Sequence, residues 1–186
     1  VDLNRAIDLD ATDATAYYSR GSAKAYKDDL DGAIIDYNRS IQLNPKYTAA
    51  YHDRGIAKKL KRDFQGAISD QSHAIELNPN LAGAYNDIAW ILATANDLSV
   101  RDGESAVKYA IKACELSKWM DPNNIDTLAA AYAESGNFDK AVALEQKYLE
   151  SNSDDKDAQA RLKLYRNHQP YRDIDKQSTP ITEKGA

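Results

Sequence analysis

Apolar side chains recur along most of the chain at intervals of three and four residues, the period of one face of an α-helix. After Ala33, for example, Tyr37 and Ile41 follow in four-residue steps. Asn44-Pro45 ends this stretch, because proline disfavours helical backbone in the residue before it. Short polar turns separate such stretches. The pattern predicts successive pairs of helices and no strands.

The helix pairs repeat along the chain. Residues 48–81 align with residues 14–47 after a shift of 34 positions, which brings Tyr17 onto Tyr51. Small residues recur where two paired helices must approach closely, namely at Gly21, Gly55, Ala89 and Ala129 in the first helices and at Ala33, Ala67, Ala106 and Ala141 in the second. A pair of helices cannot bury its apolar face alone, so stacked pairs should share one continuous core.

The period divides the chain into predicted segments. We expect a second-helix remnant of a truncated repeat at 1–13, a first repeat at 14–47, a second at 48–81, a third with a lengthened turn at 82–121, a fourth at 122–154, a capping helix at 155–169 and a polar tail at 170–186. The lengthened turn is either a functional loop on a binding edge or a neutral insertion.

The 34-residue period, with Tyr-x2-Arg-Gly, then Ala-x3-Tyr, then Pro, resembles the tetratricopeptide repeat (TPR) family, and the regularity of the motif resembles bacterial members. The resemblance implies an all-α solenoid, a right-handed superhelix of antiparallel helix pairs. It also implies a concave groove lined by the first helix of each pair, where TPR proteins bind peptides or partner proteins.

Carried over by repeat position, the resemblance places a partner-binding groove on first-helix residues of mixed character. The candidates are Tyr18, Ser22, Tyr26, His52, Asp53, Ile56, Lys59, Asn86, Asp87, Trp90 and Asp126. Three of them, Asp53, Asp87 and Asp126, would form an acidic row that favours a neutral or basic partner. Alternatively, these aspartates are merely solvated, and Trp90 packs on a neighbouring helix pair instead of a ligand.

The same positions argue against one known TPR binding mode. A subset of the family grips a C-terminal carboxylate with lysine, arginine and asparagine side chains. Of the matching positions here, only Asn86 has a required side chain, whereas Tyr18, Ser22, Gly83 and Asp87 do not. We therefore expect no carboxylate clamp.

Two arginines predict contacts inside the repeats. Arg20 and Arg54 each stand sixteen positions before an acid, Asp36 and Asp70, on the second helix of the same unit. We expect ion pairs Arg20–Asp36 and Arg54–Asp70, with solvated charges as the alternative. Exposed pairs of this kind contribute only about 0–1 kcal/mol.

Composition removes several classes of function. The net charge of −5 and the pI of about 5.2 argue against a nucleic-acid module built on a basic face. No apolar run is long enough to span a membrane. The single cysteine, Cys114, falls at a buried helix position and is expected to be a small core residue. His52 and His73 have no carboxylate or cysteine at ligand spacing. We expect no catalytic site, no metal and no cofactor.

These observations favour a non-enzymatic protein-interaction scaffold that holds a partner segment in its groove. Two alternatives stay open. The truncated first repeat leaves an apolar helix face that could join a second copy, and the repeats could be a regulatory segment of a larger protein. The sequence leaves the compartment open between the cytoplasm and export from a bacterial cell.

Overall fold

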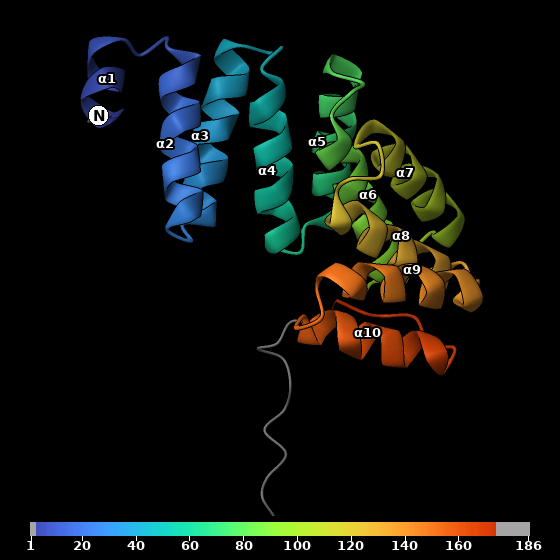
Figure 1. Ribbon diagram of the computed structural model, residues 1–186. Helices are drawn as coiled ribbons and strands as arrows, with labels where there is room; N and C mark the ends of the chain where they lie inside the picture. The colour runs from blue at the N-terminus through green and yellow to red at the C-terminus, as the bar shows by residue number, and fades with distance from the viewer. Residues whose placement is uncertain (1–2, 174–186) are drawn as a thin grey trace, which may run out of the picture.

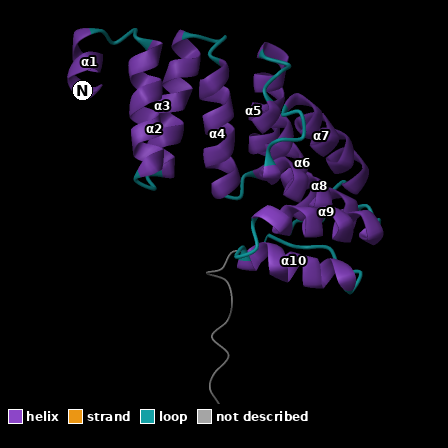
Figure 2. Cartoon of the chain, viewed as in Figure 1, coloured by secondary structure: helices purple, strands orange, loops and turns teal. Residues whose placement is uncertain are grey.

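The computed structural model describes residues 3–173, which form a curved stack of antiparallel helix pairs (Figure 1). Its helices are α1 (Leu3–Leu9), α2 (Ala14–Tyr26), α3 (Leu30–Leu43), α4 (Thr48–Leu60), α5 (Phe64–Leu77), α6 (Ala82–Thr94), α7 (Gly103–Leu116), α8 (Pro122–Glu134), α9 (Phe138–Ser151) and α10 (Lys156–Arg166). Within residues 3–173 no strand is present, and helices and loops account for the chain (Figure 2). The predicted all-α TPR-type solenoid with a C-terminal helix is confirmed.

Each helix packs mainly on its neighbours in the sequence, as a solenoid requires. Figure 1 shows α2, α3 and α4 standing side by side, whereas α9 and α10 lie across that direction. The stack therefore turns along its length. The helix bounds match the expected repeat pattern, but the assignment of the segments as repeat units remains our prediction.

Aspartates at the turns decide where helices begin. Asp29 and Asp63 precede α3 and α5, and the side chain of each accepts a hydrogen bond from a backbone N–H of the first turn. Asp28 and Arg62, one position earlier, adopt left-handed backbone with φ of 63° and 65°. This left-handed residue followed by a capping aspartate makes the tight turn within each of these pairs.

Close helix approach explains the small residues. A Cβ atom added to Gly21 would lie 2.8 Å from the ring of Tyr37, which is itself 1% exposed. Ala33 on α3 and Ala67, which faces Gly55 of α4 from α5, are both fully buried. Even one extra methyl group would push α2 away from α3.

The predicted repeat-internal ion pairs are confirmed. Arg20 donates two hydrogen bonds to Asp36, at 2.8 and 2.7 Å, and Arg54 donates two to Asp70, at 2.8 and 2.5 Å. Lys24 adds a second cation to Asp36 at 2.8 Å. Since Asp36 is 1% exposed, the carboxylate is buried and bridged, unlike a solvated surface pair.

The C-terminal end consists of α10 and the residues that follow it. Helix α10 buries Ala158, Arg161 and Tyr165, so a charged side chain lies on its packed side. Residues 170–173, at the start of the expected polar tail, are half-buried, and the Asp173 N–H donates to the Thr94 carbonyl. The rest of that predicted tail, 174–186, lies outside the described residues.

Candidate partner-binding groove

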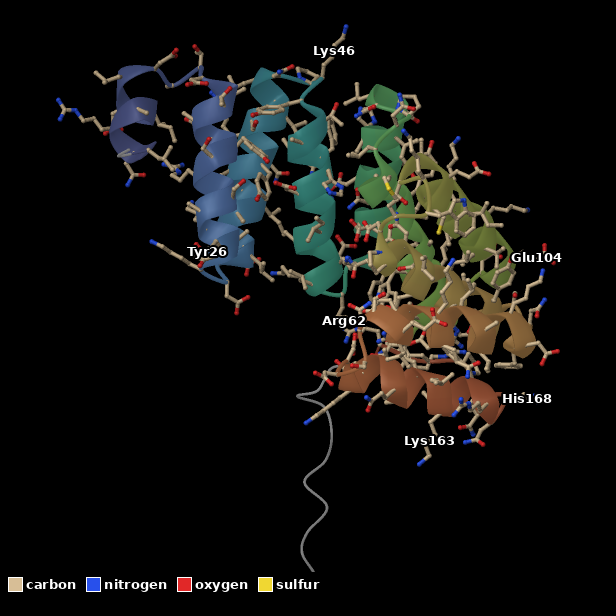
Figure 3. The ribbon with its side chains drawn as sticks, viewed as in Figure 1. Tyr26, Lys46, Arg62, Glu104, Lys163 and His168 are labelled. Atoms are coloured by element: carbon tan, nitrogen blue, oxygen red, sulfur yellow. The ribbon has the colours of Figure 1, made fainter. Side chains whose placement is uncertain are left out.

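A cleft of about 280 Å³ lies between α2 and α4, where the groove was expected. Ser22 and Tyr26 line it from α2, and Asp53, Ile56 and Leu60 line it from α4. Tyr26 is 93% exposed and Leu60 60% exposed, so apolar surface faces solvent at the cleft. Figure 3 shows Tyr26 projecting from the free end of α2. Four of the predicted groove residues therefore meet at one cavity.

A hydrogen-bonded group of tyrosines adjoins this cleft, which Ser22, Tyr37 and Asp53 help to line. The Tyr18 hydroxyl donates to Oδ2 of Asp53 at 2.9 Å, and the Tyr37 hydroxyl donates to Ser22 Oγ at 3.3 Å. Burial and the hydrogen bond to Asp53 raise the pKa of Tyr18 to about 12. Tyr18 and Asp53 therefore position each other across the step from one repeat to the next.

The middle of the concave side is a closed polar network around Asp87. Lys59 pairs with one carboxylate oxygen, and Gln71 Nε2 donates to the other at 3.1 Å. Nδ1 of His52 lies 2.8 Å from Gln71 Oε1 and 4.0 Å from Asp87. Asp87 is 8% exposed, so its charge is engaged inside the protein.

A buried charge cluster replaces the groove surface farther along. Arg161 of α10 lies 2.8 Å from Asp126 of α8, and its Nε donates to Glu145 of α9 at 3.1 Å. Burial is the main cause that raises the pKa of both carboxyl groups, and that of Glu145 rises to about 9. The raised pKa favours the protonated form of Glu145, and the Arg161 guanidinium offsets the charge of the cluster.

The three aspartates expected to form an acidic row each have a partner within the protein. Asp53 accepts from Tyr18, Asp87 pairs with Lys59, and Asp126 pairs with Arg161. Each repeat interface satisfies its own carboxylate, because a buried charge without a partner is costly. The charge of each of these aspartates is directed at its partner within the protein.

The chain itself covers the concave side near Trp90. The rings of Trp90 and Tyr171 lie 6.0 Å apart, and the Arg161 guanidinium is 5.8 Å from Trp90 and 5.7 Å from Tyr171. Trp90 therefore lies against the C-terminal segment and α10 of its own chain. Asn86, one turn away, has a buried Oδ1 without a hydrogen-bond partner within residues 3–173.

The sequence does not single out Arg161, Glu145 or Tyr171, which contact one another or the groove candidates Asp126 and Trp90. A usable signal existed for the first two. Glu145 and Arg161 are sixteen positions apart, like Gln71 and Asp87, which also join a second helix to the next first helix. No repeated interval of this kind predicts the position of Tyr171.

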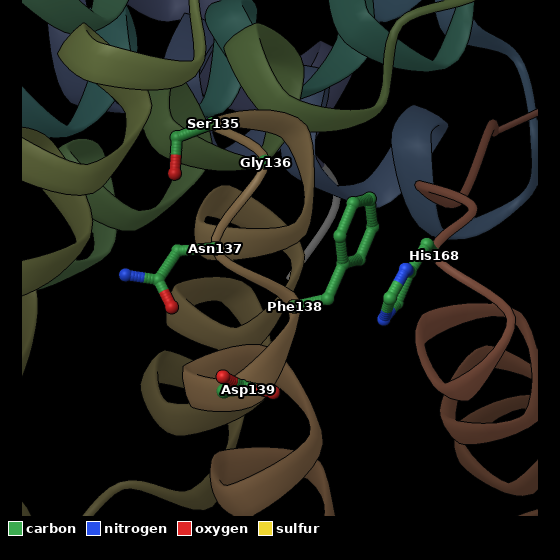
Figure 4. A pocket seen from close by; sticks show the side chains of 6 residues that line it. All are labelled: Ser135, Gly136, Asn137, Phe138, Asp139 and His168. Atoms are coloured by element: carbon green, nitrogen blue, oxygen red, sulfur yellow. The ribbon is translucent and has the colours of Figure 1, made fainter.

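A further cavity, of about 640 Å³, lies over the turn between α8 and α9 and not in the groove. Figure 4 shows Phe138 beside His168, and their rings stack at 5.1 Å and 19°. Asn137 Oδ1 accepts from the Lys140 N–H, and Ser135 Oγ donates to the Tyr132 carbonyl. These two polar groups are thus already engaged at the ends of α8 and α9.

Other candidate chemistry is structural. Cys114 is fully buried, and burial raises the pKa of its thiol to about 11. His73 lies 3.3 Å from Glu76 on the same helix. Across residues 3–173, no group of three metal-ligating side chains comes together. None of the described helices is long and apolar enough to cross a membrane.

Residues 14–47 match the family model of the tetratricopeptide repeat. No curated protein matches the sequence. Among solved structures, MamA is 20% identical, with 81% of this chain and 85% of that chain covered and a TM-score of 0.69. TTC0263, a thermophilic TPR protein of Thermus thermophilus, is 21% identical over 89% and 86%, with a TM-score of 0.65. The pilF protein of Pseudomonas aeruginosa is 13% identical over 83% and 68%, with a TM-score of 0.69.

These likenesses define the class: the chain is a TPR-type α-solenoid, and the resemblance to the tetratricopeptide repeat family is confirmed. Proteins of this class are generally non-enzymatic scaffolds for protein–protein interaction. At these sequence identities, the similarity to the solved structures establishes the fold alone.

Proposed function

We propose that this protein is a non-enzymatic interaction scaffold that binds a partner segment in the cleft between α2 and α4. The observation that carries the proposal is the cleft itself, which combines exposed Tyr26 and Leu60 with the polar pair Tyr18–Asp53. An apolar anchor from the partner would bury against Ile56 and Leu60. The hydroxyls of Ser22 and Tyr18 would orient its backbone.

The partner segment that fits is neutral or basic. Asp53 is the carboxylate at this cleft, and it already accepts a hydrogen bond from Tyr18, so a second carboxylate would meet only repulsion. The absence of a cationic clamp at Tyr18, Ser22, Asn86 and Asp87 points the same way. Binding would therefore rest on apolar contact more than on charge.

A peptide-display selection tests the proposal. Peptides retained by the wild type would be measured by calorimetry against Leu60→Asp and against the control Ile35→Asp. Ile35 is 65% exposed on the second helix α3 and does not line the cleft. We expect Leu60→Asp to weaken binding about tenfold or more, a loss of about 1.4 kcal/mol, and Ile35→Asp to leave it unchanged. Equal binding by all three proteins would contradict a site at this cleft.

Self-association is a second candidate, favoured by one observation. Helix α1 packs mainly on α2, and Leu9 beside this contact is 81% exposed. A second copy could cover this end. Sedimentation of wild type and Leu9→Asp would decide: a concentration-dependent mass lost in the variant supports it, and a constant monomer mass refutes it. Service as a regulatory segment of a larger protein remains a prediction.

A further inference from the structure

After α10 the chain reverses and returns to repeats that lie far back in the sequence. His168 adopts left-handed backbone with φ of 55°, and the Gln169 N–H closes the turn onto the Leu164 carbonyl at 2.9 Å. Residues 171–173 then run along α10 and reach the end of α6 (Figure 1). This short segment ends in contacts with Thr94 and Arg62, which are far from it in the sequence.

The end of α6 receives the backbone of the segment. The Asp173 N–H donates to the Thr94 carbonyl at 2.8 Å, and Asp173 forms a parallel bridge with Ala95. The last carbonyls of a helix lack partners within that helix, so they are free to accept from another chain segment. Arg62, labelled in Figure 3 at the end of α4, donates to the Asp173 carbonyl at 2.7 Å. These contacts would hold any extended backbone.

Each side chain of the segment has its own partners. Tyr171 lies against both the Trp90 ring and the Arg161 guanidinium. Arg172 reaches Glu134 at 2.6 Å, and the Asp173 carboxylate lies 3.4 Å from Arg62. An aromatic, a basic and an acidic side chain are therefore each matched by complementary chemistry.

The lengthened turn of the third unit helps to build this surface. Arg101, within that turn, donates to Glu134 at 3.1 Å and to the Ala95 carbonyl at 2.9 Å. It thereby fixes the carboxylate that receives Arg172 and the residue that bridges to Asp173. Glu134 has a side chain that is only 12% exposed, so its charge is set in place before any ligand arrives. Of the two roles expected for the turn, this geometry favours the functional one.

We propose that this surface, formed by Trp90, Thr94–Ala95, Glu134 and Arg62, is a second peptide-binding site. It takes an extended aromatic–arginine–aspartate segment, and residues 171–173 are its resident ligand. The cis contacts are few and partly solvated, since the Arg172 and Asp173 side chains are 28% and 38% exposed. Covalent attachment nevertheless supplies an effective concentration in the millimolar range, so a free peptide must compete with the chain's own segment. The site is separate from the α2–α4 cleft and does not depend on that proposal.

A peptide with the sequence of residues 169–174, labelled with fluorescein, tests this proposal by fluorescence anisotropy. The receptor is the full chain carrying Tyr171→Ala and Arg172→Ala, which removes the anchors of the resident segment while leaving every helix intact. We expect the peptide to bind this variant about tenfold or more tightly than it binds the wild type, because the wild type is already occupied. Circular dichroism should show equal helicity.

Two controls test whether Glu134 recognises the arginine of the peptide. A peptide with glutamine in place of arginine should bind the released variant several-fold more weakly. Adding Glu134→Gln to that variant should abolish the preference for arginine, whereas adding Ile35→Asp on α3 should change nothing. Tyr171→Ala alone provides a second release variant. The proposal is overturned if neither released variant binds the peptide, or if both peptides bind equally well.

Discussion

Arg161 of α10 and Glu145 of α9 form a hydrogen-bonded pair at 3.1 Å, in which the side chains are only 6% and 0% exposed. Asp126 of α8 completes the cluster at 2.8 Å from Arg161. One guanidinium thus links the last three helices. Because α10 has few other large buried side chains apart from Tyr165, this cluster largely decides how firmly the last helix is held.

Removing the arginine should loosen the C-terminal end. Arg161→Met leaves two buried carboxyl groups without their cation, and breaking a buried pair in this way costs about 3–5 kcal/mol. Chemical denaturation should show this loss, and hydrogen exchange should place it in α8–α10. The control Arg166→Met changes an exposed arginine of the same helix and should cost little. Equal stability of both variants would contradict a structural role for the cluster.

Glu145 should make stability fall as pH rises. Burial, with the nearby Asp126 charge next in size, raises its pKa to about 9 in the folded protein from an ordinary value of 4.5. Between these values the folded state holds a proton that the unfolded state has lost. Unfolding free energy then declines by up to about 1.4 kcal/mol per pH unit for this group.

Glu145→Gln tests that slope, because the amide imitates the protonated acid. We expect the variant to gain stability relative to wild type from pH 5 to pH 9, with no further gain above. Thermal unfolding at several pH values measures the difference. A wild-type curve parallel to that of the variant over this range would show that Glu145 is ionised in the folded protein.

Asp36 should act in the opposite direction. Burial alone would raise its pKa, but hydrogen bonds from Arg20 and Lys24 outweigh burial and hold the pKa below its usual 3.8. The stabilisation is therefore present above the unfolded pKa and is lost as pH falls through the folded value. Asp36→Asn should cost about 1–3 kcal/mol at pH 7 and should flatten the acid side of the stability curve. Asp31→Asn, at a side chain 79% exposed, is the matched control and should have little effect.

Gly21 should not tolerate a methyl group. Its added Cβ would approach the buried Tyr37 ring to 2.8 Å and the Ala33 carbonyl to 3.2 Å. We expect Gly21→Ala to lower stability by about 1–3 kcal/mol despite the better helix propensity of alanine. Gly83→Ala on α6 meets only His52, at 3.4 Å, and should be neutral or stabilising. The two denaturation midpoints, measured side by side, give the answer.

The sequence predicts the parts of this molecule that its period controls. Helix limits follow from apolar spacing and turn residues, and the Arg20–Asp36 pair follows from its repeated interval. The contact between residues 171–173 and the end of α6 does not follow from the period. Asp173 reaches Thr94 because the stack curves. That curvature is the sum of small rotations between pairs, which no single residue encodes. The pairing of Asp87 with Lys59 was hidden for a related reason, since it crosses from one pair to the next.

Contacts in the stack run between helices that are near one another in the sequence, so small changes between successive helices add up to a large change in length. The hydrogen bond from Arg62 to Asp173 joins two points 111 residues apart and thereby ties the turn after α4 to the C-terminal segment. A ligand that displaced residues 171–173 would remove this link and allow the helix stack to extend. Peptide recognition and overall dimensions would then be coupled, so a binding event could be read as a longer molecule by small-angle X-ray scattering.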